Sequence, residues 1–293
     1  LNIDIGTNTI KIITGTLTKD LIKVTEAFIL QTPEGTVSDG NILDIPLLKE
    51  TIQTDLVKRN IKLNEVNFTI ASTETITREI VLPKVRRKKL EKMIPFEVER
   101  QLPILLEDYV LDYIEIEELN ENNFKKVRLQ IGALPKVIVE DYLQLAAALS
   151  LKPKSLVIHS QSIAQLSKLL TEINNKPFES NLTIAFLEIS QHYINCNIVA
   201  NGVALLNRFI PIAQLEIEEW LQDVERVFRF FLNIKKDNII DKIYLYGGRV
   251  RAQDVGTVEN GLNISTELIE KLGNVQWPEY VKSEDIGLYL NAL

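Results

Sequence analysis

The sequence has few of the residues that build covalent or metal-based frameworks. Its 293 residues include one cysteine, Cys196, and two histidines, so an internal disulfide is excluded and a structural zinc cluster is not expected. The sequence also lacks an apolar run long enough to cross a bilayer and a basic-then-apolar start typical of a signal peptide. Acidic residues outnumber basic ones, 40 to 33, which gives a net charge of −7 and argues against nucleic acid as a partner. These absences predict an ordinary globular protein in the cytoplasm.

The chain begins with a strand-like alternation, LNIDIGTNTIKIITGTL, that bends around an unusual set of groups. An acid precedes the bend, a glycine forms it, polar residues occupy the tip and a lysine follows: Asp4, Gly6, Thr7, Asn8, Thr9 and Lys11. A plain turn needs only Gly or Asn, and the additional groups are those that bind phosphate. A polar hairpin without a ligand accounts for the same residues, so both interpretations stay open at this point.

The two halves of the chain repeat one pattern. Residues 1–30 predict a three-stranded meander, followed by a helix over 46–60 and a strand over 67–72. Three further strands follow the loop 174–181, and they lead to a helix over 215–236 and the strand KIYLYGG. Between the repeats lies a β-α-β-β-α block. We therefore predict an α/β protein with a first lobe over 1–176, an inserted subdomain over 74–151 and a reduced second lobe over 177–293.

This duplicated pattern resembles the actin/sugar-kinase ATPase superfamily and, more narrowly, the PilM family of type IV pilus assembly, related to the division protein FtsA. The matching segments are IDIGTNTIK at 3–11, GNILD at 40–44, TREIVLP, EVERQLP and VLDY between 77 and 113, YLYGGRV at 244–250 and DIGLYLNAL at 285–293. The resemblance implies duplicated actin-like, ribonuclease H-like lobes with an FtsA-type α+β insert. It also implies that the outer helical subdomain of the second lobe is missing, because only IAQLE (212–216) separates the third strand from its helix.

The resemblance also implies a site for ATP or ADP with Mg²⁺ between two hairpins. Asp4 and Glu188 would hold the Mg²⁺ through water, and the nucleotide would meet Gly6, Thr7, Asn8, Thr9, Lys11, Ser190, Gly247 and Gly248. The second hairpin, LEISQHYIN, departs from the family pattern. Ser190 stands where a glycine is expected, and its Cβ would obstruct phosphate, so a purely structural turn is the alternative. Gln161 is the candidate for orienting a catalytic water, with a helix-surface role as the alternative, and His159 is expected to be a core or loop histidine.

The resemblance finally implies a partner, the cytoplasmic tail of a PilN-like inner-membrane protein, bound between the first lobe and the insert. The candidate contacts lie on the first strand and charged helix of the insert: Thr75, Arg78, Arg86, Arg87, Leu90 and Ile94. A solvated helix face or association with anionic lipid heads would also explain the basic run on this helix.

The function predicted from these features is that of a cytoplasmic actin-like adaptor at the inner face of the cytoplasmic membrane. It would join a PilN-like tail to other type IV pilus machinery, with weak or lost ATP binding, little or no ATPase activity and self-association as a further option. The alternatives are an active actin-like ATPase able to form filaments and a sugar-kinase-like enzyme, for which no substrate-facing carboxylate base can be assigned.

Overall fold

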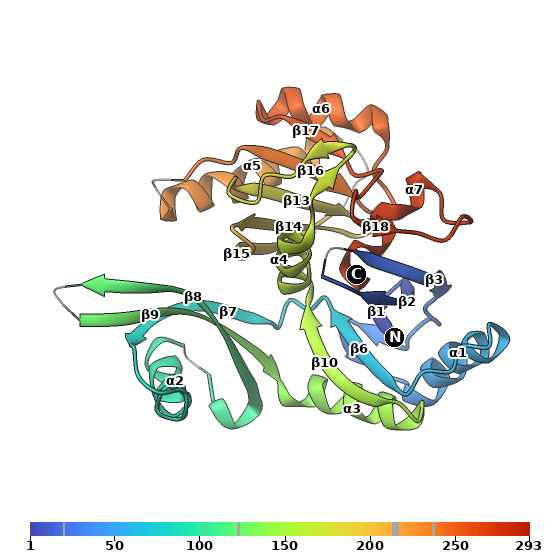
Figure 1. Cartoon of the computed structure of the whole chain (residues 1–293), viewed down its shortest axis with the longest axis horizontal. Helices are drawn as coiled ribbons and strands as arrows, with labels where there is room; N and C mark the ends of the chain where they lie inside the picture. Colours follow the sequence, from blue (N-terminus) through green and yellow to red (C-terminus); the bar gives the residue numbers. More distant parts are fainter. Residues whose placement is uncertain (20, 103, 122–123, 213–216, 236–237) are drawn as a thin grey trace.

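The computed structural model describes residues 1–19, 21–102, 104–121, 124–212, 217–235 and 238–293. This part of the chain forms two α/β lobes and a third, smaller sheet that extends beside them (Figure 1). None of its helices combines the length and the apolar character that a membrane crossing requires.

The first lobe is built on a six-stranded sheet with the order β10-β6-β1-β2-β3-β18. Its strands are β1 (Asn2–Ile5), β2 (Thr9–Leu17), β3 (Ile22–Gln31), β6 (Glu65–Ile70), β10 (Lys152–Ile158) and β18 (Val275–Gln276). Strands β1, β2 and β3 form the predicted antiparallel meander, and β6 and β10 continue the sheet in parallel from β1. Ile3, Ile5, Ile10 and Ile12 point to one face because alternate residues of a strand share a side, and they are buried there.

Two helices, α1 (Ile45–Lys58) and α3 (Lys136–Ala148), pack on this apolar face. A short hairpin of β4 (Val37–Ser38) and β5 (Asn41–Ile42) leads into α1. Helix α1 begins one residue before the predicted start at 46. The side chain of Asp44 accepts a hydrogen bond from the Leu47 N–H at 2.9 Å, and Pro46 occupies the first turn.

The second lobe repeats this topology, so the predicted duplication is confirmed. Its strands are β13 (Ile184–Ile189), β14 (Tyr193–Ala200), β15 (Val203–Pro211), β16 (Lys242–Tyr246) and β17 (Thr266–Leu268), and its helices are α5 (Ile217–Ile234) and α6 (Ala252–Leu262). The order β15-β14-β13-β16-β17 reproduces β3-β2-β1-β6-β10, with the same antiparallel and parallel pairings. The segment 213–216, on which the prediction of a missing outer subdomain depends, lies outside the described residues.

The insert has its own three-stranded sheet, β7-β9-β8, and one helix. Its elements are β7 (Ile76–Pro83), α2 (Arg87–Gln101), the 3₁₀ turn η1 (Leu106–Asp108), β8 (Tyr109–Glu121) and β9 (Phe124–Pro135). Helix α3 differs from the prediction, which assigned it to the insert. Its apolar residues, Ile138, Tyr142 and Leu145, are buried in the first-lobe core, and α3 takes the place that α6 has in the second lobe. By packing, the insert therefore ends with β9 rather than at residue 151.

The lobes are joined by elements that cross from each to the other. Helix α4 (His159–Leu169) follows β10 but packs on β14 and β15, and one apolar core contains residues of both sheets. In return, β18 pairs with β3, and the last turn, η2 (Gly287–Ala292) after α7 (Ser283–Ile286), packs on β1 and β2. A small hairpin, β11 (Glu172–Ile173) and β12 (Lys176–Pro177), marks the passage between the lobes. The predicted division at residue 176 therefore separates the repeats in sequence, whereas their packing interlocks them.

Candidate functional site

Four ionisable side chains meet where the two hairpins face each other. The Lys11 ammonium lies 3.0 Å from Asp4 Oδ2 and 3.4 Å from Glu188 Oε1. His159 Nε2 lies 2.7 Å from Asp4 Oδ1, and its Nδ1 lies 3.6 Å from Glu188 Oε2. Asp4, Glu188 and His159 are buried, and the Lys11 side chain is 13% exposed. We call these four residues the interlobe cluster.

The duplicated topology brings the two acids together. Asp4 lies opposite Lys11 in the β1–β2 hairpin, and Glu188 lies opposite Asn195 in the β13–β14 hairpin. The hairpins close alike: the Gly6 N–H donates to the Thr9 carbonyl and the Ser190 N–H to the Tyr193 carbonyl, each at 3.0 Å. Glu188 is thus the counterpart of Asp4, and the prediction that these acids and Lys11 share one site agrees with their positions.

His159 is the member of the cluster that sequence reasoning missed. It is the first residue of α4, directly after the carboxyl end of β10, which runs parallel to β6 and β1. Ligand sites in open α/β sheets lie beyond these strand ends, so its position was a usable signal. His159 was expected to be a core or loop histidine. It is indeed buried, but that expectation did not include its contacts with Asp4 and Glu188.

Mutual attraction keeps all four side chains charged despite their burial. Burial alone would lower the pKa of His159, but Asp4 and then Glu188 raise it, to about 9. Burial would raise the pKa of Glu188, but Lys11 and His159 lower it to about 2. The pKa of Asp4 falls below its usual range and that of Lys11 rises above it, because the attraction between them outweighs their burial. Two carboxylates therefore face two cations, and the cluster is neutral as a whole.

This arrangement does not fit a hydrated Mg²⁺ between the acids. Both carboxylates are already neutralised by Lys11 and His159, and a divalent cation would have to displace these two positive charges at close range. In the part of the chain that is described, no group of three or more His, Cys, Asp and Glu side chains is placed to hold a metal ion. Ser190, in addition, uses its hydroxyl within the turn, where it donates to the Tyr193 carbonyl at 2.9 Å.

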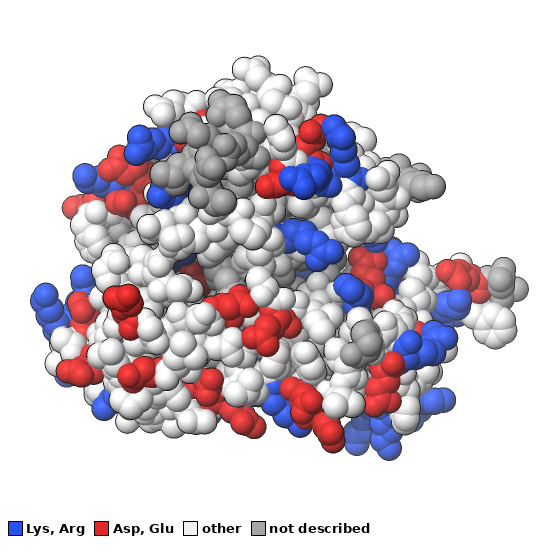
Figure 2. Space-filling model, turned by 180° about the vertical axis from the view of Figure 1, so that it is seen from behind, with Lys and Arg blue, Asp and Glu red and all other residues white. Residues whose placement is uncertain are grey.

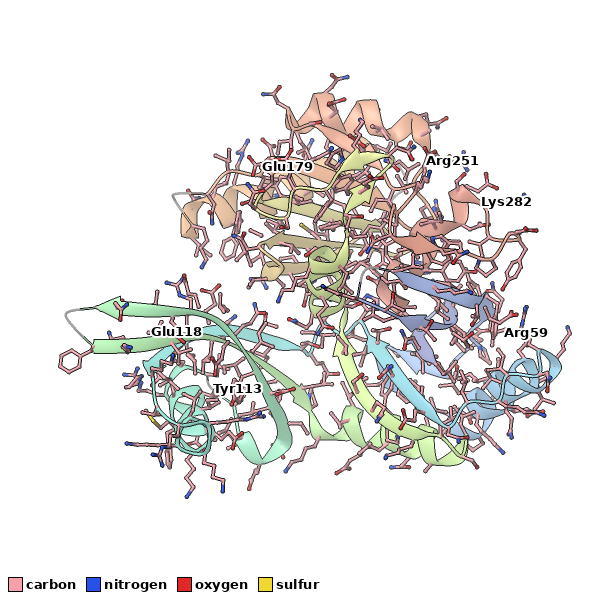
Figure 3. The ribbon with its side chains drawn as sticks, viewed as in Figure 1. Arg59, Tyr113, Glu118, Glu179, Arg251 and Lys282 are labelled. Carbon is pink, nitrogen blue, oxygen red and sulfur yellow. The ribbon has the colours of Figure 1, made fainter. Side chains whose placement is uncertain are left out.

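The remaining predicted nucleotide residues divide between two places. At the first hairpin, Thr7 and Asn8 are exposed, and the backbone carbonyls of Gly6 and Asn8 accept hydrogen bonds from Thr32. Ser190 and Gly248 line a cavity of about 650 Å³ with Trp220, Arg249 and Arg251, among others. Figure 3 shows Arg251 at the start of α6, and we call this cavity the second-lobe pocket. Among the described residues that line it, none belongs to the first hairpin or to the interlobe cluster.

Gly247 has a structural reason to be glycine. Its φ of +108° is unfavourable for other residues, and a Cβ there would lie 2.5 Å from the Ile189 carbonyl oxygen. The turn after β16 therefore presses against the second hairpin, and the Arg249 N–H donates to the same carbonyl at 3.2 Å.

Gln161 lies away from the interlobe cluster, although it is only two residues beyond His159. It lines a groove of about 490 Å³ between β10 of the first lobe and the insert. We call this cavity the insert groove; it is bordered by β7, β8, β9, β10 and α4. The structure therefore gives the site a histidine at the start of α4, whereas the predicted glutamine faces another cavity.

The predicted partner-binding residues are also divided. Thr75 lines the insert groove, and its hydroxyl is buried without a hydrogen-bond partner in the described structure. Arg78 is exposed on β7, and Arg86 and Arg87 are exposed at the start of α2. Leu90 and Ile94 belong to the apolar core under the insert sheet, so they are not available to a docked partner and this part of the prediction is wrong.

Two interlocked lobes of one topology, with acid-bearing hairpins that face each other, define an actin-like protein. The family model described as type IV pilus assembly protein PilM matches residues 2–209. The chain therefore belongs to the PilM family of type IV pilus assembly proteins.

Solved structures agree with this fold. A structure of a PilM–PilN type IV pilus biogenesis complex matches with a TM-score of 0.82 at 18% identity, covering 99% of this chain and 95% of that one. The ethanolamine utilization protein EutJ of Carboxydothermus hydrogenoformans matches with a TM-score of 0.52 at 10% identity, over 99% and 87% of the two chains. The cytoplasmic domain of EpsL, an inner-membrane component of the Vibrio cholerae type II secretion system, matches with a TM-score of 0.50 at 8% identity, over 94% and 88%.

Proposed function

We propose that this chain is a cytoplasmic actin-like adaptor of type IV pilus assembly that binds the cytoplasmic tail of a PilN-like inner-membrane protein in the insert groove. Membership of the PilM family supports the pilus role. The likeness to a chain of a PilM–PilN complex supports the choice of partner. The observation that carries the proposal is the groove itself, which lies between the edges of two separate sheets.

The two sheet edges make the groove suitable for an extended peptide. In the described structure, β10 is one of the two outer strands of the first-lobe sheet, and β8 is one of the two outer strands of the insert sheet. Five consecutive β10 residues, 154–158, and three consecutive β8 residues, 112–114, line the groove. Among the strands that the structure describes, β10 and β8 each have one side without a neighbouring strand, and the groove also touches residues 130–134 of the central strand β9. Edge N–H and C=O groups pair with an added strand.

The side chains of the groove provide apolar surface and a few polar contacts. Val110, Ile114, Leu134 and Leu156 offer apolar contacts, and Asp112, Lys154 and Gln161 provide polar ones. This combination favours an extended, largely apolar segment.

Nucleotide binding is proposed to be weak or lost. The interlobe cluster supplies its own positive charges in place of a metal, and Ser190 uses its hydroxyl inside the turn that would have to receive phosphate. Isothermal titration with Mg-ATP tests this point, and we expect no micromolar binding. Micromolar binding that is lost in Asp4→Ala would instead favour the alternative, an active actin-like ATPase.

Blocking the groove tests the adaptor function. A Cβ on Gly132, in the groove wall, would meet nothing within 4 Å, so Gly132→Leu fills the groove without a clash in the strand. We expect this variant to bind a fluorescent peptide of the cognate PilN N-terminal tail at least about tenfold more weakly, the loss of one or two hot-spot contacts. The measurement is fluorescence anisotropy with the purified chain.

The matched control is Gly256→Leu. A Cβ added to Gly256 would also meet nothing within 4 Å, and Gly256 lies on α6, which Figure 1 shows on the second lobe at the end away from the insert. It should bind the peptide like the wild type. An absence of peptide binding by the wild type at high micromolar concentration would overturn the adaptor proposal. Equal binding by Gly132→Leu and Gly256→Leu would show that the peptide binds outside the groove.

A further inference from the structure

Helix α2 presents an outward face that the adaptor function leaves unexplained. Leu90, Ile94 and Val98 bury one side of the helix against the insert sheet. Phe96, which projects away from that buried side, is 74% exposed. The helix lies on the side of the insert sheet away from the second lobe (Figure 1). Its outer face is therefore free to contact something outside the chain.

This face is strongly basic in a chain whose net charge is −7. Five cationic side chains and one acidic side chain lie between Arg86 and Lys92, which gives this stretch a net charge of +4. Seen from behind, Lys and Arg gather at the lower right of the molecule, where the insert lies (Figure 2). Only Arg87 of the five is paired, with Glu91 at 2.9 Å; the others, Arg86, Lys88, Lys89 and Lys92, form no ion pair within the described structure.

These cations lie where a helix gains nothing from them. They occupy the first two turns, near the positive end of the helix macrodipole, and the first turn contains no acidic residue. Acids follow later in the segment: Glu97 pairs with Arg100, and Glu99, Glu107 and Asp108 are exposed. A face that only had to be solvated would be more stable with these charges in the reverse order. The arrangement therefore points to an anionic partner.

The spacing places the aromatic ring among the cations. Lys89, Lys92, Phe96 and Arg100 follow at intervals of three, four and four residues, so they share one side of the helix. In the described part of α2, Phe96 is the one large apolar side chain that is mostly exposed. A protein interface usually buries a cluster of apolar anchors, whereas a single ring among lysines suits the headgroup layer of a bilayer.

We propose that the outer face of α2 docks on an anionic bilayer surface, with Lys88, Lys89 and Lys92 against lipid phosphates and Phe96 in the interface between headgroups and acyl chains. This contact is independent of the insert groove. It would hold the insert against the membrane from which a partner's tail emerges.

Vesicle co-sedimentation of the full chain, without any peptide, tests the proposal. The wild type should bind vesicles of phosphatidylglycerol and phosphatidylcholine, bind pure phosphatidylcholine weakly, and lose binding at high salt. The triple variant Lys88→Gln, Lys89→Gln, Lys92→Gln should bind the anionic vesicles about a hundredfold more weakly, at about fivefold per lysine. The control, Lys23→Gln, Lys58→Gln, Lys62→Gln, removes the same charge from exposed first-lobe positions and should bind like the wild type.

Insertion of the ring has its own readout. A Phe96→Trp variant should be quenched by vesicles with brominated acyl chains, while the two native tryptophans, Trp220 and Trp277, give the wild-type background. Failure of the wild type to bind anionic vesicles overturns the proposal, as does equal weakening by the two triple variants. If the lysine variant loses binding but Phe96→Trp is not quenched, the ring does not insert into the bilayer and the contact is purely electrostatic. Because no peptide is present, these outcomes are separate from the test of the groove.

Discussion

Replacing His159 by glutamine should remove a specific pH dependence of stability. In the wild type the ring is held between Asp4 and Glu188, which raise its pKa to about 9 from an ordinary value of about 6.5. Glutamine has no charge to lose in this range, although its amide can still donate to Asp4. The difference in free energy of unfolding between the two proteins therefore reports the protonation of one ring.

The sign and size of the effect follow from linkage. The folded pKa is higher than the unfolded one, so the stabilisation is fully present below about pH 6.5 and is lost as the pH rises towards 9. A rise from 6.5 to about 9 corresponds to about 3 kcal/mol. The wild-type advantage over His159→Gln should thus shrink by about 3 kcal/mol between pH 6 and pH 9.

Two measurements check this reasoning. Urea unfolding of both proteins across the pH range gives the difference in free energy, and the comparison cancels the other groups that titrate there. NMR titration of the imidazole resonances follows the ring directly. Only two histidines are present, and a His192→Gln variant assigns the second resonance.

An ordinary or lowered pKa for His159 would refute the argument, because the ring would then be neutral and the cluster would carry a net negative charge. A stability difference that stays constant from pH 6 to pH 9 would refute it equally. Either result would mean that Asp4 and Glu188 are not fully neutralised by Lys11 and His159, so that a metal cation could bind between them.

Two further substitutions test the packing of the second hairpin and the joining of the two lobes. Gly247→Ala should destabilise the chain by at least about 2 kcal/mol, because the φ of Gly247 is positive and the new Cβ would press on the Ile189 carbonyl. The control, Gly256→Ala, lies in a helix with open space around the new Cβ and should stabilise the chain by up to about 1 kcal/mol. Equal urea midpoints for the two variants would contradict both predictions. Leu290→Ala should cost about 2–5 kcal/mol, since Leu290 is fully buried in the core shared by the lobes; a loss no larger than that of Leu17→Ala on the exposed end of β2 would show that the C-terminal turn does not join the lobes.

Much of the architecture could be predicted because it depends on local patterns. The alternation of Ile3, Ile5, Ile10 and Ile12 predicts a hairpin with one buried face, and the repeat of that pattern after residue 181 predicts the second lobe. Pro46 predicts the start of α1 in the same way, because its fixed φ suits the first turn of a helix.

The errors concern contacts between segments far apart in the sequence. Helix α3 has a clear helical pattern, but the pattern does not say which sheet it covers, and it packs on the first lobe rather than in the insert. Leu90 and Ile94 were assigned to a partner, but their apolar spacing serves the insert core. Amphipathic periodicity predicts that one face of a helix is buried, but it does not predict which sheet or partner that face packs against.

The sequence by itself determined the two repeats, their strands and helices, and the two acids at equivalent places in the hairpins. Only the tertiary structure decided what those acids contact, because His159 reaches Asp4 from a strand end 155 residues away and Lys11 reaches Glu188 across 177 residues. A strand or a turn is specified by residues a few positions apart, whereas the charge balance of a buried cluster depends on distances between groups that only the packed lobes bring together.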